Sequence, residues 1–364
     1  IGIGGSRFVA RDDRQAVLVE RQIELPDYEA ALKTTLEWLK TAPGGQHLRV
    51  VGHRVVHGGA EHTKPQLVTP ALLRALKQLI PLAPDHLPQE IEAIEIVQRL
   101  YPNLKQVVCF DTAFHRTMPR TAQLYGLPMK IAEEGIIRYG FHGLSYEYIV
   151  QELARQAGEK ASRGRIIVAH FGNGASLAAI RDGKSVDTTM GFTPTGGMPM
   201  STRSGDLDPG VILYLIQEKN CSPAQVNELV TRKGGLLGIS GVSSDMKDLL
   251  AKEKESATSA EAIAVFCYQA RKYIGALAAA LGGLDTLVFT GGTGENASEI
   301  RQRICAGLEF LGINLDVKPN KCNGPIISGA GSAVTVRVIQ TNEELMIASH
   351  ARDVSGQAEQ AQRK

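Results

Sequence analysis

The stretch Phe289-Thr290-Gly291-Gly292-Thr293-Gly294-Glu295-Asn296-Ala297 ends a buried apolar run and precedes a helical one. A strand, a glycine-rich loop and a helix N-terminus in this order form an anion-binding geometry, because backbone N–H groups point at the ligand. Gly292, Gly294 and Ala297 also match the dinucleotide fingerprint, but too few βαβ units follow to build a dinucleotide-binding fold. The P-loop pattern G-x-x-x-x-G-K-[ST] is absent from the sequence. The stretch therefore predicts a phosphate loop of another nucleotide-binding family.

Similar apolar, β-branched runs recur along the chain and end in Gly- or Asp-rich turns. They predict buried strands over residues 48–56, 106–110, 165–170, 286–290 and 334–339. The pair Asp182-Gly183 predicts a tight hairpin before a strand at 184–189. Helical periodicity marks residues 70–79, 89–100, 146–158, 209–218, 259–281, 295–311 and 343–353, and we expect the polar tail 354–364 to fray. Alternating strands and helices predict an α/β architecture with sites at the carboxyl ends of the strands.

The bulk composition is that of an ordinary α/β protein. The 364 residues include 40 basic and 38 acidic side chains, a net charge of +2 that favours neither nucleic acid nor a membrane surface. No apolar run approaches the roughly 18 residues that span a bilayer. The five cysteines are scattered and never in C-x-x-C spacing, which predicts reduced, mostly buried thiols in a cytoplasmic protein and neither a disulfide nor a zinc framework.

Gly52-His53-Arg54-Val55-Val56-His57-Gly58-Gly59 closes the first predicted strand. An arginine close to a glycine pair at a strand end suits the clamping of an anionic group. His53 and His57 have the i, i+4 spacing of a zinc helix. In a strand, however, such residues lie about 13 Å apart, and no Glu stands between them. The stretch therefore favours an anion clamp at Arg54 over a metal site.

Polar residues at other strand ends carry two interpretations each. Asp111, within Phe110–His115, can bind Mg²⁺ or orient a reactant, or it can cap a turn. His142, bracketed by glycines before a helix, can donate a hydrogen bond to a ligand or can be structural. The small residues Gly172-Asn173-Gly174 let backbone N–H groups approach a phosphate closely, or they form a simple β-turn.

Arg203, in a later stretch, is equally open. Asp208 and Pro209 predict a helix start, and Arg203 in the preceding turn can point into a cleft or form a surface salt bridge. Glu343 lies at the junction between the last predicted strand and helix, where an acidic residue suits the first turn of the helix.

Taken together and in this order, these motifs resemble the acetate kinase (acetokinase) family from Ile1 to about Asp353. The resemblance implies a duplicated α/β fold of the actin, Hsp70 and sugar kinase (ASKHA, ribonuclease H-like) type, with a cleft between two domains. We expect an N-terminal domain of residues 1–112, to which 344–364 return, and a nucleotide-binding domain of 113–343. The resemblance also implies ATP and a small carboxylate as ligands, Mg²⁺ (or Mn²⁺) as cofactor, a homodimer and a cytoplasmic location.

The resemblance assigns a role to each matching residue. Asp111, His142 and Arg203 would be catalytic, and Glu343 would help to hold the metal. Arg54 would clamp the carboxylate, while Val56, Phe141 and Pro194 would line the pocket for its alkyl end. The nucleotide-binding residues would be His170, Phe171, Gly172, Asn173, Gly174, Asp245, Met246, Lys247, Gly292, Thr293, Gly294, Glu295 and Asn296.

The chain departs from the family pattern in three places. The N-terminal strand and phosphate hairpin Asn-x-Gly-Ser-Ser-Ser-x-Lys are missing, so we expect severely reduced activity of this chain. Asp85 stands in Ala83-Pro84-Asp85-His86-Leu87-Pro88 where the family has a leucine that would touch the substrate's methyl group. The loop 193–200 differs from the family's Leu-Glu-Gly-Leu version. Acetate is thus less firmly implied than the reaction type.

The chemistry fits these residue types, because a carboxylate is already ionised at neutral pH and needs no strong general base. It needs cancellation of repulsion between two anions and in-line positioning, which arginines, a histidine and Mg²⁺ supply. A propionate or other short-acid kinase shares every motif. An inactive actin-like nucleotide-binding protein is the alternative from another class, but it has no need of the clamp formed by Arg54 and Arg203.

Overall fold

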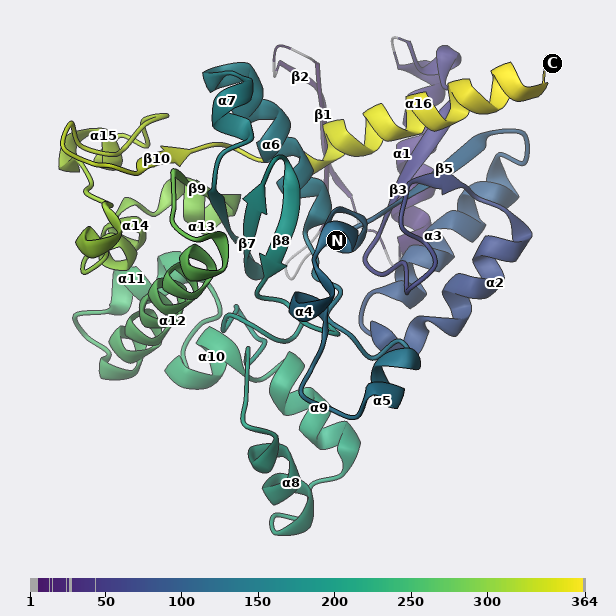
Figure 1. The fold of residues 1–364 in the computed structure, drawn as a ribbon. Coiled ribbons are helices and arrows are strands. Elements are labelled where there is room, and N and C mark those ends of the chain that lie inside the picture. The colour runs from purple at the N-terminus through teal and green to yellow at the C-terminus, as the bar shows by residue number, and fades with distance from the viewer. Residues whose placement is uncertain are drawn as a thin grey trace. The chain divides into compact units, whose positions relative to one another are not determined.

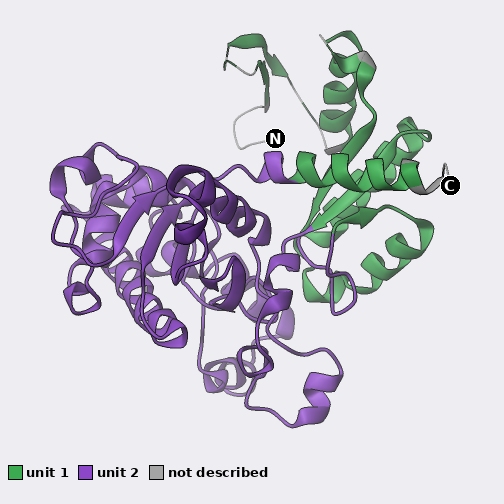
Figure 2. Cartoon of the chain, turned by 45° about the horizontal axis from the view of Figure 1, so that its top comes forward, with its two compact units in different colours: residues 1–55, 65–109, 347–364 green, residues 56–64, 110–346 purple. Residues whose placement is uncertain are grey.

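The computed structural model describes residues 6–12, 14, 16–23, 25, 28–42 and 44–362 (Figure 1). The opening residues Ile1–Gly5, with which the family resemblance begins, lie outside the described residues. The chain divides into two compact units (Figure 2). Unit 1 comprises Ile1–Val55, Pro65–Cys109 and Ile347–Lys364, and unit 2 comprises Val56–Lys64 and Phe110–Met346.

Unit 1 contains a three-stranded sheet in the order β3-β5-β4 and an antiparallel pair, β1 and β2. Helix α2 begins because the Thr69 side chain accepts a hydrogen bond from the Leu72 backbone N–H, with Pro70 at the first helical position. Gly52 on β3 leaves room for Ile347 of α16 to pack against the strand. The elements are β1 (Ser6–Arg11), β2 (Val17–Ile23), α1 (Tyr28–Thr41), η1 (Gly45–His47), β3 (Val50–Val55), β4 (Gln66–Leu67), α2 (Pro70–Gln78), η2 (Ile80–Leu82), α3 (Leu87–Leu100), β5 (Lys105–Phe110) and α16 (Glu343–Gln362).

Unit 2 is built on a five-stranded sheet in the order β10-β9-β6-β7-β8, with β6, β9 and β10 parallel and the other pairs antiparallel. Its strands are β6 (Ile166–Phe171), β7 (Ala175–Arg181), β8 (Lys184–Thr188), β9 (Thr286–Thr290) and β10 (Thr335–Val338). Its helices are η3 (Ala113–Thr117), α4 (Arg120–Gln123), α5 (Met129–Glu133), α6 (Gly143–Ala157), α7 (Glu159–Ser162), α8 (Pro209–Gln217), α9 (Pro223–Thr231), α10 (Gly235–Ser240), α11 (Met246–Lys252), α12 (Ala257–Leu281), α13 (Gly291–Asn296), α14 (Ser298–Cys305), η4 (Glu309–Leu311) and α15 (Val317–Lys321).

Helices cover both faces of this sheet, as the fully buried strands β6 and β9 require. Alternate residues of the strands, such as Val168 and Val288, pack with Tyr146 and Ile149 of α6. The other face carries Phe171, whose ring lies 5.1 Å from that of Phe266 on α12. The carboxyl ends of β6 and β9 therefore emerge between two helical layers, where polar residues can form a site.

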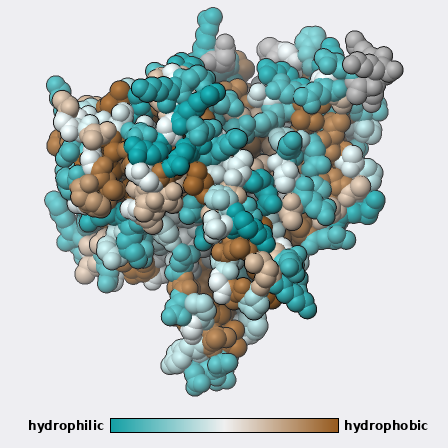
Figure 3. All heavy atoms as spheres, in the orientation of Figure 1, coloured by the Kyte–Doolittle hydropathy of each residue, from teal (hydrophilic) through white to brown (hydrophobic). Residues whose placement is uncertain are grey.

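Apolar side chains are exposed on α8, a helix of unit 2 whose sequence is Pro-Gly-Val-Ile-Leu-Tyr-Leu-Ile-Gln. Leu213 is 54% exposed and Tyr214 53% exposed. Hydrophobic side chains are visible on the surface over α8 and its neighbour α9 (Figure 3). This apolar surface is a candidate contact with another protein chain.

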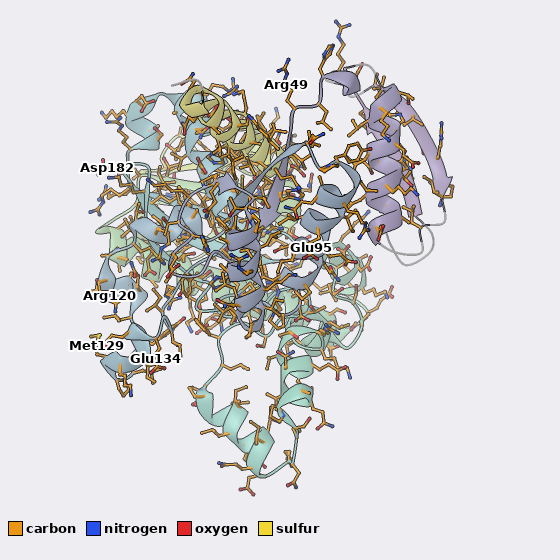
Figure 4. The ribbon with its side chains drawn as sticks, turned by 90° about the vertical axis from the view of Figure 1, so that its right-hand side faces the viewer. Arg49, Glu95, Arg120, Met129, Glu134 and Asp182 are labelled. Carbon is orange, nitrogen blue, oxygen red and sulfur yellow. The ribbon has the colours of Figure 1, made fainter. Side chains whose placement is uncertain are left out.

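The predicted hairpin at Asp182-Gly183 is confirmed. Both residues have positive φ, 54° and 70°, which is the conformation that a two-residue type I′ turn requires. Asp182 lies at the tip and its side chain points outward (Figure 4). The turn pairs Arg181 with Lys184, and a bulge between Ala179 and Ile180 then shifts the register along the rest of the two strands.

The predicted strands all occur, but two helix predictions are wrong. Residues 295–311 do not form one helix: α13 already begins at Gly291, Ala297 breaks the helix with φ −96° and ψ 79°, and α14 follows. The glycines therefore form the first turn of α13 and not a loop before it. The tail expected to fray after Asp353 continues α16 to Gln362, since Ala and Gln favour helix.

The part of the chain that the structure describes contains no helix long and apolar enough to span a membrane.

Candidate active site

The His142 turn, residues 139–143, leads into α6 and has an unusual backbone. His142 adopts a left-handed conformation, φ 59° and ψ 25°, which non-glycine residues rarely take. The Gly143 backbone N–H donates to the carbonyl oxygen of Asp111 at 2.9 Å, an approach so close that a side chain at Gly143 would clash with that carbonyl. The turn thus places His142 beside the end of β5.

The His142 ring is held by a buried polar network. Its Nδ1 lies 2.8 Å from Ser176 Oγ, and that hydroxyl lies 2.5 Å from the Tyr146 hydroxyl. Burial, followed by smaller effects that include the Glu343 charge, raises the pKa of Tyr146 well above its ordinary value, so the phenol stays protonated. With Nδ1 bonded to Ser176, the Nε2 atom is the one that faces Gly174.

His170 extends this network from the end of β6. Its ring stacks on that of His142 with centroids 4.3 Å apart. Its Nδ1 lies 2.9 Å from Ser145 Oγ, which in turn lies 2.8 Å from Thr341 Oγ1. Ser145 of α6, which also contacts Thr341 before α16, therefore holds the His170 ring at the end of β6, and that ring stacks on His142.

Arg203 reaches the same place from the turn before α8. Its Nη1 donates to the Pro194 carbonyl at 2.7 Å. A Cβ atom built on Gly174 would lie 2.8 Å from Arg203 Nη2 and 2.9 Å from His142 Nε2. Two of the three predicted catalytic side chains thus converge on one glycine, and the arrangement suits binding of an anionic group by charge-assisted hydrogen bonds.

Asp111 and Glu343, the predicted carboxylates, both belong to unit 2. Asp111 follows β5 beside the His142 turn and is fully buried. Glu343 begins α16, close enough to Tyr146 for its charge to raise the phenol's pKa. Among the described residues no three His, Cys, Asp or Glu side chains group as a metal site. Mg²⁺ commonly takes only one or two protein carboxylates and completes its shell with waters and phosphates, so these residues fit it.

Arg54 lies on β3 in unit 1 and is exposed. Asp85, the departure from the family pattern, is also in unit 1 and is half-buried. The other predicted catalytic and metal-binding residues belong to unit 2.

A pocket of about 760 Å³ opens beside this site within unit 2, a volume typical of small-molecule sites. Eight of the predicted nucleotide-binding residues line it: Gly172, Asn173, Asp245, Met246, Lys247, Gly292, Thr293 and Asn296. The Asp245 carboxylate caps α11 by accepting from the Lys247 backbone N–H at 2.8 Å. The pocket thus brings together predicted residues from three separate segments of the chain.

The sequence reasoning missed six residues of this pocket, namely Ser201, Leu236, Ser244, Leu250, Phe266 and Ala297. Ser201 and Ser244 lie next to residues that were singled out, and Ala297 ends the opening glycine-rich stretch, so their position was the available signal. Leu236, Leu250 and Phe266 belong to helices, where an apolar side chain that lines a pocket has the same sequence pattern as one in the core.

Five predicted nucleotide-binding residues are placed differently. His170 and Gly174 belong to the convergence of His142 and Arg203 described above, and Gly294 and Phe171 are buried. The Glu295 carboxylate accepts from the backbone N–H groups of Gly291 and Thr341, at 2.9 and 3.1 Å. Glu295 therefore ties α13 to the segment before α16.

The residues predicted to line the acyl pocket all belong to unit 2, namely Val56, Phe141 and Pro194. Val56 and Phe141 are buried, and Pro194 is half-buried. His57 packs its ring edge-on against Phe141, with centroids 5.5 Å apart. Burial lowers the pKa of His57 to about 4, so its ring is neutral and suits an apolar wall.

The loop 193–200 fits its environment through two glycines. The Gly197 N–H donates to Asp206 Oδ1 at 2.6 Å, and the Gly197 backbone has φ 87°. A side chain there would meet the Thr189 carbonyl at 2.7 Å. Because Gly196 and Gly197 carry no side chains, the loop, which precedes Arg203 in the chain, can pack against Asp206.

This sheet, its strand-end residues and the pocket define a phosphotransferase of the actin and sugar kinase fold class. The acetokinase family model matches residues 6–349, and the chain belongs to that family. It is thus a kinase that transfers a phosphoryl group to a carboxylate.

Relatives and solved structures agree with this assignment. The chain is 47% identical to an acetate kinase of Methylocella silvestris over 94% of this chain and 85% of the relative. It is similar to the crystal structure of Porphyromonas gingivalis acetate kinase, with TM-score 0.85, 38% identity and coverage of 97% and 90%. A propionate kinase structure from Francisella tularensis gives TM-score 0.88 and 35% identity, with coverage of 96% and 89%. The predicted fold class is confirmed.

Proposed function

We propose that the chain catalyses reversible phosphoryl transfer between ATP and acetate, which yields ADP and acetyl phosphate. The observation that carries the proposal is the convergence of Arg203 Nη2 and His142 Nε2 on Gly174, beside the pocket. In the forward reaction a carboxylate oxygen forms the new bond to the γ-phosphorus. The bond to the β,γ-bridging oxygen breaks, and ADP leaves with that electron pair.

The chain's residues bind and orient two anions in this reaction. Arg203 and Arg54 clamp the carboxylate and the transferring phosphoryl group, and His142 donates from Nε2 to the same group. Asp111 orients the site and, with Glu343, holds Mg²⁺ (or Mn²⁺). The bound metal neutralises phosphate charge. No residue has to remove a proton, because the carboxylate is ionised.

We assign the nucleotide to the pocket between α11 and α13. Its apolar side chains, Leu236, Leu250 and Phe266, suit a purine ring, and the small residues at Gly172 and Gly292 suit phosphates. Acetate is favoured over a longer acid because the chain is similar over most of its length to acetate kinases. Propionate is the second candidate, favoured by the similarity to the Francisella tularensis propionate kinase.

We further propose a cytoplasmic homodimer. The exposed apolar side chains of α8 support self-association, since large exposed apolar patches mark interaction sites. For the domains we retain residues 1–112 with 344–364, and residues 113–343, as our assignment.

A hydroxamate trap of acyl phosphate tests the reaction. The full-length protein, ATP and Mg²⁺ are incubated with acids from formate to butyrate, and the Arg203→Ala protein measures contaminating kinase. We expect product with acetate, less with propionate, and none after chelation of the metal. If no acid yields hydroxamate above the Arg203→Ala background, the kinase proposal fails. Binding of ATP without acid-dependent turnover would instead favour the inactive nucleotide-binding protein.

A further inference from the structure

His115 lies in η3, just after β5, and is buried on all sides. Its Nε2 lies 2.9 Å from the Phe141 carbonyl oxygen, and its Nδ1 lies 2.8 Å from Ser185 Oγ. Because a carbonyl oxygen can only accept, Nε2 carries the hydrogen and Nδ1 accepts from the Ser185 hydroxyl. Both ring nitrogens are therefore occupied in a single tautomer.

The Phe141 carbonyl belongs to the His142 turn. The residue after it, His142, holds a left-handed backbone that an isolated chain disfavours. Such a backbone persists only where the surroundings fix it. Gly140 packs directly on the His115 ring, since a Cβ there would lie 2.7 Å from the ring's Cγ. The ring thus supports the turn at Gly140 and bonds it at Phe141.

We propose that His115 is a positioning residue for phosphoryl transfer: by holding the Phe141 carbonyl, it sets the turn that aims His142 Nε2 at Gly174. The expected effect on kcat rests on the proposed function, whereas the expected effect on the position of the His142 ring does not. Burial lowers the pKa of His115 to about 4, so it performs this role as a neutral ring. A phenylalanine would fill the same space without the hydrogen bond.

Two substitutions separate the hydrogen bond from packing. In His115→Gln the amide nitrogen is as far from Cβ as Nε2 and can still donate to Phe141. In His115→Asn the amide ends near the Nδ1 position, so it keeps the Ser185 side and loses the Phe141 side. We expect His115→Asn to lower kcat about tenfold or more with KM for ATP within about twofold, and His115→Gln to restore most of kcat. Ser185→Ala, which spares the Phe141 bond, is the control and should keep kcat within about threefold.

A second readout does not depend on turnover. The ¹H–¹³C signals of the His142 ring, assigned with His142→Asn, should move in His115→Asn and stay in place in His115→Gln. The proposal is wrong if His115→Asn keeps wild-type kcat, if His115→Gln falls as far as His115→Asn, or if the His142 signals do not move. If His115→Asn does not fold, His115→Met replaces it, since Met fills the space without a donor. Loss of hydroxamate from the wild type would overturn the function and leave the His142 signals to decide the positioning role.

Discussion

Gly174 lies at the point where the Arg203 and His142 side chains meet, and a single methyl group there tests the site. In Gly174→Ala the new Cβ would lie 2.8 Å from Arg203 Nη2 and 2.9 Å from His142 Nε2. Ordinary contacts between such atoms are about 3.5 Å or longer. Both side chains must therefore move by about 0.6 Å or more.

Neither side chain moves without cost. Arg203 is held to the Pro194 carbonyl at 2.7 Å, and His142 is held by Ser176 and by the stacked ring of His170. A misplacement of about 1 Å can lower a rate about 10²-fold, equivalent to about 2.7 kcal/mol in the activation free energy. We expect Gly174→Ala to lower kcat by about 10- to 100-fold. ATP affinity should change little, because the nucleotide pocket is lined by other residues.

The assay is hydroxamate formation under saturating acetate, combined with binding of a fluorescent ADP analogue. Gly275→Ala on α12 is the control for adding a methyl group, because its Cβ would find nothing within 4 Å. Far-UV circular dichroism and a thermal melt verify the fold of both variants. A Gly174→Ala enzyme within about threefold of wild-type kcat, or an equal loss in Gly275→Ala, would refute the reasoning.

Three further predictions concern charge, the polar network and pH. Arg203→Ala should lower kcat at least about 10²-fold with the circular dichroism spectrum unchanged, and a near-normal rate would remove Arg203 from the site. Ser176→Ala should lower the free energy of unfolding by about 1–3 kcal/mol by leaving the buried Tyr146 hydroxyl unpaired, and adding Tyr146→Phe should recover part of that loss in urea titrations. His57 and His115 both have pKa values lowered to about 4, so the unfolded chain binds protons that the folded chain does not as pH falls below about 6.5. Each of the two histidines should therefore lower the free energy of unfolding by about 2 kcal/mol between pH 7 and pH 5. A free energy of unfolding that does not fall over this range would contradict the lowered pKa values.

The strands and the order of their terminal motifs could be predicted because both are local in sequence. Apolar, β-branched runs predict β6 and β9, and the residues after these strands are small or polar. Convergence of Arg203 and His142 on Gly174 could be inferred only through family resemblance, since nothing in the spacing of these three residues measures their distance in space. The structure places both side chains against Gly174, and their catalytic roles are our proposal.

The parts that could not be predicted depend on tertiary contacts. The Gly-rich stretch has poor helix propensity, yet it forms α13, because the Glu295 carboxylate accepts from the Gly291 and Thr341 backbone N–H groups. A glutamate in a phosphate motif has no sequence signal that distinguishes this role from ligand binding. Phe266 is similar: a buried phenylalanine on a long helix has the sequence pattern of a core residue, yet it also lines the pocket to which we assign the nucleotide.

The neutral histidines follow from what this reaction requires. An ionised carboxylate needs no base, so a buried histidine serves best here as a rigid hydrogen-bonding ring that adds no charge. His57 and His115 meet this condition, and they contact Phe141 from two directions, one at its ring and one at its carbonyl. A protonated ring at either position would add a buried charge next to Phe141, which costs free energy unless the charge is paired. The burial that keeps both rings neutral therefore preserves the charge pattern of the site, and the loss of stability in mild acid is its consequence.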